Sequence, residues 1–160
     1  MRALRSERRI SCIGNIPFHR SHEQHFSNGQ SHIIHKNRWS TPLEAKFKAM
    51  IVWLILNGRT EEALALLAKN YNVNMPKLKV GLPKGHKKNV SGCYTAKNET
   101  ISVLNSDAIK NPFVILHEFY HHLRTSIDKK HKGTEKNASK FANEFIEEYK
   151  SMTTRAQNNL

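Results

Sequence analysis

The first regular pattern of apolar positions along the chain lies in residues 43–57, where such residues recur three and four positions apart. The positions concerned are Leu43, Phe47, Met50, Ile51, Leu54 and Ile55. This spacing predicts one apolar face of an α-helix, with Pro42 at its start and Gly58 as the expected C-cap. A second, shorter amphipathic helix is expected to open at Thr60 and to reach Tyr71.

The next segments contain the short runs that are typical of β-strands. Residues 77–82, 90–95 and 100–104 are the three strand candidates. The last two are separated by a turn-like stretch, residues 96–99, and therefore predict a β-hairpin. Together with the helices that precede and follow them, these strands predict an α+β fold with N-terminal helices and a small twisted sheet that contains the hairpin.

Two more helices are predicted in the C-terminal half of the chain. The first starts at Asn111-Pro112, because Asn is a favourable N-cap and Pro a favourable first helical residue. Its apolar flank consists of Leu116, Phe119, Tyr120 and Leu123. The second has Thr134 as its expected N-cap and an apolar face at helical spacing. The positions on this face are Ala138, Phe141, Ala142, Phe145, Ile146 and Tyr149.

Residues 1–40 differ from the rest of the chain, because they show no sustained apolar periodicity. They hold seven Lys or Arg, two acidic residues and five histidines. We therefore expect a basic, His-rich arm that is disordered, followed by one folded domain over residues 41–150 and a tail over residues 151–160. The spacing of the arm's histidines defines no single metal site: they are His19, His22, His25, His32 and His35.

The side chains with the clearest chemistry form the run His117-Glu118-Phe119-Tyr120-His121. On a helix, residues four apart lie one turn above each other, so His117 and His121 can bind one metal ion between them. Glu118 then lies beside that ion. Because zinc lowers the pKa of a bound water, a neighbouring carboxylate can take a proton from this water and pass it to a leaving amine. The run therefore predicts a zinc-binding active-site helix with Glu118 as general base.

Catalytic zinc normally takes three protein ligands, so the two histidines need a third partner. Glu135 is the first candidate, because it heads the last helix on the apolar face of Ala138 and Ala142, where a carboxylate is costly without a partner. Its alternative role is a favourable interaction with the helix dipole. His131 is the second candidate, although it lies among lysines that disfavour a dication, and Glu144 is expected to face solvent.

The His-Glu-x-x-His run, followed by Glu135 in the pattern Glu-x-x-Ala-x-x-Phe-Ala, resembles the gluzincin metallopeptidases in their smallest forms, the minigluzincins and the related ImmA/IrrE-type proteins. The similarity covers roughly residues 71–149. The resemblance implies a zinc-dependent peptidase in which one Zn²⁺ ion is held by His117, His121 and Glu135, with Glu118 as the general base. The last helix would then be a glutamate helix that supplies the third ligand.

The resemblance also implies how a peptide or protein substrate binds. In the similar families, an edge strand next to the zinc helix pairs with extended substrate through main-chain hydrogen bonds, and residues 101–104 are the expected strand. An oxyanion needs a further donor; Tyr120, His122 and Tyr149 are candidates between which the spacing does not choose. Self-inhibition, with the basic arm or the tail after Tyr149 lying in the cleft, is compatible with this arrangement.

The formal net charge of +13 favours a different class of function. Residues 1–40, with seven basic and two acidic side chains, carry +5, and the other 19 basic and 11 acidic side chains carry +8. A basic surface attracts nucleic acid or other polyanions. The alternative to the peptidase is therefore a basic regulatory or nucleic-acid-associated protein with a structural or single-target zinc site. Its densest basic patches lack the interleaved aromatic residues of a single-strand binder.

The two cysteines, Cys12 and Cys93, indicate no disulfide framework, because one lies in the arm and 80 residues separate them. A reducing cytoplasm is the expected compartment. The most apolar run, residues 49–56, is far shorter than the roughly 20 residues that cross a bilayer. No membrane association is therefore expected.

Overall fold

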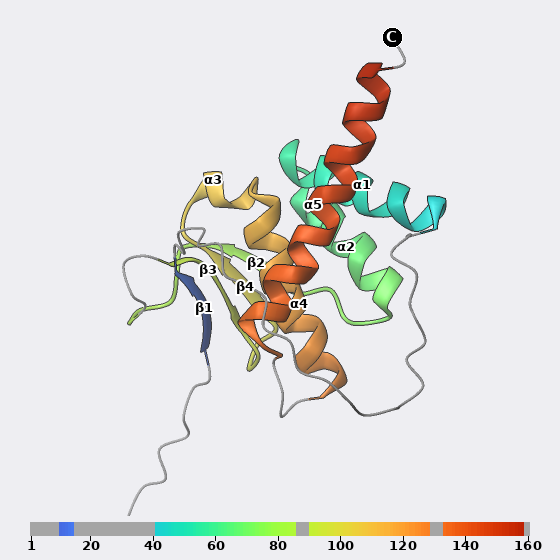
Figure 1. The fold of residues 1–160 in the computed structure, drawn as a ribbon. Helices are drawn as coiled ribbons and strands as arrows, with labels where there is room; N and C mark the ends of the chain where they lie inside the picture. The colour runs from blue at the N-terminus through green and yellow to red at the C-terminus, as the bar shows by residue number, and fades with distance from the viewer. Residues whose placement is uncertain (1–9, 15–40, 86–89, 129–132, 159–160) are drawn as a thin grey trace, which may run out of the picture.

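The structure is a computed structural model that describes the backbone of residues 10–14 and, with side chains, residues 41–85, 90–128 and 133–158. Its elements follow one another as β1 (Ile10–Gly14), α1 (Pro42–Leu56), α2 (Thr60–Tyr71), β2 (Lys77–Val80), β3 (Val90–Thr95), β4 (Thr100–Val103), α3 (Ser106–Ile109), α4 (Pro112–Ile127) and α5 (Glu135–Asn158). Helices and a small mixed sheet are both present, so the predicted α+β fold is confirmed (Figure 1).

α1 spans nearly the predicted residues, but its buried side is different. The Thr41 hydroxyl caps the start by accepting a 3.2 Å hydrogen bond from a backbone N–H of the first turn, and the C-cap is Asn57, one residue before the predicted Gly58. Leu43 and Met50 were expected in the core, yet they are 79% and 42% exposed. Because α1 contacts α2, α4 and α5, its buried side chains are not confined to one narrow face. They are Ala49, Ile51, Val52, Leu54 and Ile55.

The sheet has four strands in the order β1-β3-β4-β2. β3 and β4 form the predicted antiparallel hairpin, β2 runs parallel to β4, and β1 runs antiparallel to β3. β4 is therefore an interior strand, and the prediction that residues 101–104 form a substrate-binding edge is wrong. The physical reason is that the main-chain groups on both sides of β4 are already paired, with β2 and with β3.

β1 belongs to the arm for which the sequence predicts disorder. Residues 10–14 pair with β3, so this prediction is wrong for these five residues. A strand this short gives almost no periodic signal, and its partner lies about 80 residues further along the chain, which is why the pattern did not reveal it. The five histidines of the arm lie outside the described residues.

α4 is the central helix of the fold. It contacts β3 and β4 on one side and α1 and α5 on the other, and Figure 1 shows the sheet and the helices α1 and α2 on opposite sides of it. The largest fully buried side chains come from all of these layers and include Phe119, Phe145, Ile51, Leu64, Ile101 and Leu116. Polar side chains of α4 that face β3 or α5 are therefore enclosed by other elements.

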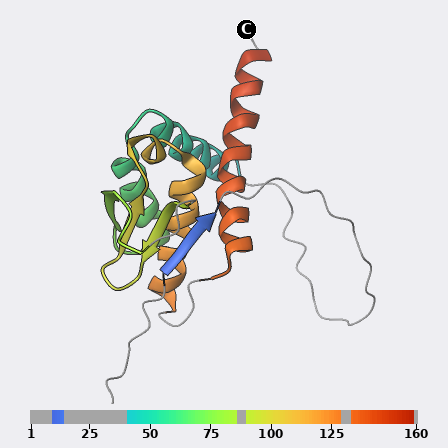
Figure 2. The same ribbon diagram turned by 90° about the vertical axis from the view of Figure 1, so that its left-hand side faces the viewer.

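α5 continues to Asn158, so residues 151–158 of the predicted tail are the last turns of a helix. Figures 1 and 2 show these turns projecting beyond the rest of the fold. Neither α5 nor any other helix in the described part of the chain combines the length and the apolar character of a membrane span.

Tyr71, at the end of α2, joins three helices through its ring. The ring centroid lies 6.1 Å from that of Phe119 in α4 and 5.9 Å from that of Phe141 in α5. Burial raises the pKa of Tyr71 to about 12, and the charges of Glu44 and Glu144 act in the same direction. The folded chain therefore holds the phenol proton more tightly than an exposed tyrosine does.

We expect this difference to make Tyr71 a source of instability at alkaline pH. Between pH 10 and about 12, the unfolded chain releases the proton while the folded chain retains it, so the free energy of unfolding falls as the pH rises. Urea unfolding on either side of pH 10 measures the decrease, which should be smaller for Tyr71→Phe than for the wild type. Equal decreases in the two proteins would contradict this role.

Candidate metal centre

Two histidines of α4 lie on one face of the helix, and a cap fixes where that helix begins. The Asn111 side chain accepts hydrogen bonds from the backbone N–H groups of Phe113, at 3.0 Å, and of Val114, at 3.4 Å, as an N-cap does. His117 and His121 follow one turn apart, and their ring centroids are separated by 5.0 Å. Their relative exposures are 1% and 0%, so the pair of imidazoles is buried.

The start of α5 brings a carboxylate to this pair. Thr134 Oγ1 accepts a 3.2 Å hydrogen bond from the backbone N–H of Asn137, as expected of the predicted cap, and Glu135 is the first residue of α5. Glu135 Oε2 lies 2.9 Å from His117 Nε2, and Glu135 Oε1 lies 3.6 Å from His121 Nε2. The Glu135 side chain is half exposed, so solvent reaches the group from this side.

These three side chains could hold one metal ion. Their ligand atoms lie within 4.8 Å of one another, and the ligands of a tetrahedral zinc ion stand roughly 3.3 Å apart at bond lengths of about 2.0–2.1 Å. Burial lowers the pKa of His117 and outweighs the opposing hydrogen bond to Glu135, which favours the neutral imidazole that a metal ion requires. Two imidazoles and a carboxylate fit zinc and also several other transition metals.

Glu118 is fully buried where α4 packs against β3. Opposite it lies Gly92 of β3, at which a Cβ atom would stand 3.3 Å from Glu118 Cγ and 2.7 Å from Val114 Cγ1. Only glycine allows the strand to pass this close to the helix. Gly92 is absent from the predicted site residues, although a glycine inside a strand pattern is typical of such a close approach.

Replacing Gly92 with Ala is expected to lower the free energy of unfolding by about 1–3 kcal/mol, because the added methyl group overlaps Val114. Chemical denaturation of the wild type and the variant measures the change. Adding Val114→Ala removes the overlapping atom, so the double variant should lose less stability than the two single variants do in sum. Simple additivity would show that the strand and the helix are not in close contact here.

A second glycine, Gly133, sets the path of the chain into α5. Its φ is 76°, in the region that favours glycine, and a Cβ atom there would stand 2.5 Å from Tyr120 Cε1 and 3.0 Å from Arg124 Cγ. Because Glu135 follows two residues later, this contact with α4 helps to determine where the carboxylate enters the site. The only signal in the sequence is a glycine directly before a predicted helix start.

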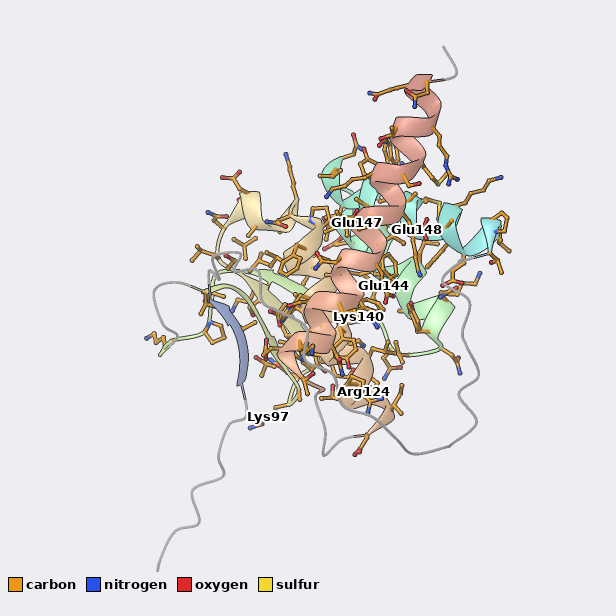
Figure 3. The ribbon with its side chains drawn as sticks, viewed as in Figure 1. Lys97, Arg124, Lys140, Glu144, Glu147 and Glu148 are labelled. Carbon is orange, nitrogen blue, oxygen red and sulfur yellow. The ribbon has the colours of Figure 1, made fainter. Side chains whose placement is uncertain are left out.

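The other carboxylate considered as a third ligand, Glu144, lies further along α5. Nine residues of helix separate it from Glu135, which is a rise of roughly 13 Å, and Figure 3 shows it beyond Lys140, away from the first turn. Its side chain is exposed, and its charge acts on Tyr71. The structure thus brings Glu135, and not Glu144, to the two histidines. His131 lies outside the described residues.

His122, considered as a donor to an oxyanion, has a different role. Its Nε2 donates a 2.7 Å hydrogen bond to the backbone carbonyl of Asn74, and its Nδ1 lies 3.1 Å from Tyr94 Oη. Because a carbonyl only accepts, Nε2 carries the proton and Nδ1 accepts from the phenol. Burial lowers the pKa of His122, which favours this neutral form. Both ring nitrogens are occupied, so His122 connects α4 to the sheet and is not an oxyanion donor.

The two tyrosines considered as donors lie in different places. Tyr149 follows Glu135 by 14 residues, a rise of roughly 21 Å along α5, and packs against the core. The Tyr120 ring centroid lies 5.9 Å from that of His121, and its hydroxyl is close to Gly133. Tyr120 is therefore the candidate donor that stays beside the metal-binding group.

A cavity of about 590 Å³ opens at the turn of the hairpin, where Figure 3 labels Lys97. It is lined by residues of the hairpin, of the segment around Lys77 and of the last turns of α4, and by none of the three candidate ligands. The metal-binding group is thus a separate feature of the structure.

Comparison of the chain with protein-family models, with curated proteins and with solved structures gave no match. The similarity to gluzincins therefore rests on the His-Glu-x-x-His run and on the position of Glu135. What the structure itself provides is a group of two imidazoles and one carboxylate that could hold a metal ion, with a buried carboxylate next to it in the chain.

Proposed function

We propose that the chain is a zinc-dependent metallopeptidase of the gluzincin kind, which hydrolyses peptide bonds with His117, His121 and Glu135 as zinc ligands and Glu118 as general base. The observation that carries this proposal is the 2.9 Å contact between His117 Nε2 and Glu135 Oε2. It joins residues 18 positions apart into the three-ligand set that a catalytic His-Glu-x-x-His helix requires.

The number of ligand side chains supports a catalytic site over a structural one. A structural zinc site is closed by four protein ligands, whereas a catalytic site keeps one position for water or substrate. Within the described residues, the group that gathers here contains three ligand side chains, and the exposed side of Glu135 faces solvent. A fourth ligand position is therefore available to a water molecule.

Proton transfer is the task assigned to Glu118. When bound, zinc supplies a water of lowered pKa and polarises the substrate carbonyl. The Glu118 carboxylate, enclosed between α4 and β3, accepts a proton from the attacking water and returns it to the leaving amine. Gly92 contributes by leaving room beside this carboxylate, since any side chain at that position would press on α4.

The proposed substrate is a peptide or protein segment in extended conformation. Of the strands, β3 makes the most extensive contact with α4, so we assign to β3 the substrate-binding role that was predicted for residues 101–104. A peptide that takes the place of β1 on the outer edge of β3, opposite its pairing with β4, would pass close to Glu118.

Incubation of the zinc-loaded chain with a mixture of unstructured peptides, under reducing conditions, tests the proposal. We expect new N-termini in the mass spectra, their loss when a zinc chelator is added, and their return when zinc is restored. A chain that carries zinc but cuts no peptide would refute the peptidase, and so would cleavage that the chelator leaves unchanged.

A further inference from the structure

The register between β1 and β3 places the two cysteines opposite each other. The Cα partners are Ile10↔Thr95, Ser11↔Tyr94, Cys12↔Cys93 and Gly14↔Val90. Directly opposite residues of antiparallel strands have Cα atoms about 4.5–5.5 Å apart and share one face of the sheet, and disulfides span Cα distances of about 4.4–6.8 Å. The pairing therefore permits a disulfide between these two cysteines, although they lie far apart in the sequence.

The edge of β3 that β1 covers runs past the proposed active site. β3 pairs with β4 along its other edge, and Gly92 lies against Glu118. The register shifts between Cys12 and Gly14, so Ile13 lies opposite the part of β3 that contains Gly92. Figure 2 looks onto β1, which runs along the outside of the sheet in the direction of α5.

An extended substrate and β1 would need the same main-chain groups of β3. The N–H and C=O groups on one edge of a strand pair with one neighbouring strand at a time, and strand addition by a peptide requires that edge to be open. β1 is itself an extended segment in antiparallel pairing with β3. It therefore occupies the edge of β3 in the extended, hydrogen-bonded conformation that a bound substrate would adopt.

We propose that Cys12 and Cys93 form a redox-controlled disulfide that holds β1 on the edge of β3 and thereby excludes extended substrates from the metal site. In the reduced chain, β1 detaches and returns, and a substrate competes with it. In the cross-linked chain, β1 stays in place. The consequence for activity rests on the proposed peptidase function, whereas the cross-link and the closed edge do not depend on it.

A small-molecule disulfide, such as oxidised glutathione, can form the bond by thiol–disulfide exchange. One cysteine thiolate attacks it, forms a mixed disulfide and releases the first small thiol; the second cysteine then displaces the other half. Two cysteine thiols are oxidised and one small disulfide is reduced to two thiols, so protons and electrons balance. Because Cys93 is fully buried, the finished bond is shielded on that side from reductants in solution.

Intact-mass spectrometry of the folded, full-length chain tests the cross-link. After treatment with oxidised glutathione and blocking of the remaining thiols, we expect the wild type to have lost two hydrogen atoms and to have taken up no blocking reagent. Proteolysis should then release two peptides joined through Cys12 and Cys93. Cys12→Ser is the matched control, in which no internal bond forms. A wild-type chain that ends with glutathione on its cysteines, or with free thiols, would overturn the proposal.

Binding of a probe peptide tests the closed edge without relying on hydrolysis. The probe is a fluorescent pentapeptide, Ile-Ser-Ser-Ile-Gly, which copies β1 without its thiol, and all proteins carry Glu118→Gln to prevent cleavage. We expect the reduced chain to bind the probe at least roughly tenfold more tightly than the cross-linked chain, and a reductant to restore binding. The oxidant-treated Cys12→Ser chain should bind as the reduced chain does. Equal binding by both forms, or none by the reduced form, would overturn the proposal.

The outcomes separate this inference from the proposed function. A chain without peptidase activity that still forms the cross-link and excludes the probe would refute the peptidase and support the disulfide. A chain that hydrolyses peptides equally fast before and after cross-linking would support the peptidase and refute the control of its site by β1.

Discussion

Replacing Glu118 with Gln is expected to lower the rate of peptide hydrolysis by roughly 10²- to 10⁴-fold, which is the usual contribution of general acid–base catalysis. Gln resembles Glu in shape but cannot accept a proton from water and return it. Because Glu118 is buried against β3 and is not one of the three candidate ligands, the variant should keep both its fold and its zinc. Initial rates of cleavage of one peptide by the zinc-loaded proteins measure the effect.

Glu144→Gln is the matched control, because Glu144 is exposed on α5 and takes no part in the proposed chemistry. It should cleave at the wild-type rate. If Glu118→Gln retains the wild-type rate, another group is the base. If it loses zinc together with activity, Glu118 supports the ligands, and its assignment to proton transfer is wrong.

Replacing Glu135 with Ala is expected to weaken zinc binding by more than about 100-fold, since the loss of a direct ligand exceeds the 10- to 100-fold cost that is typical of changes around the ligands. The side chain is half exposed, so the stability of the metal-free chain should change little. Competition with a chromophoric chelator gives the affinity. The gain in unfolding free energy when zinc is added gives a second measure, because an ion that binds the folded state stabilises it.

Glu144→Ala removes the same side chain from the same helix, at a distance from the histidines, and should bind zinc as the wild type does. Unchanged affinity in Glu135→Ala would exclude this carboxylate as the third ligand. His131 would then be the remaining candidate for the third ligand.

The parts of the site that could be predicted depend on residues close together in the sequence. Asn111 and Pro112 fix the start of α4 through a side-chain cap and a restricted φ, and the four-residue spacing then places His117 and His121 on one face. Glu135 could be predicted because it heads an amphipathic helix, where a carboxylate on the apolar face needs a partner.

The order of the strands could not be predicted, because it depends on pairing between distant segments. All four residues of β4 are buried, as in an interior strand, but Thr100 and Ser102 give its sequence the mixed character of a half-exposed one. β1 is a more extreme case, since Cys12 and Cys93 become neighbours only when the arm pairs with β3.

The need for glycine at two positions beside the site could not be predicted either, because it also depends on how separate elements pack together. Gly92 matters because β3 passes close to Val114 and Glu118, and Gly133 matters because the chain entering α5 touches Tyr120. Each requirement arises from the contact between two elements. A single sequence shows the glycine but not the neighbour that makes a side chain impossible there.

Anomalous diffraction at the zinc absorption edge, from crystals of the zinc-loaded chain, can locate the ion itself. We predict one strong peak within about 2.0–2.2 Å of His117 Nε2, His121 Nε2 and a carboxylate oxygen of Glu135, with Glu118 beside it and outside bonding distance. A peak at the cysteines or at the histidines of residues 1–40, with none between α4 and the start of α5, would contradict a catalytic zinc site in this protein.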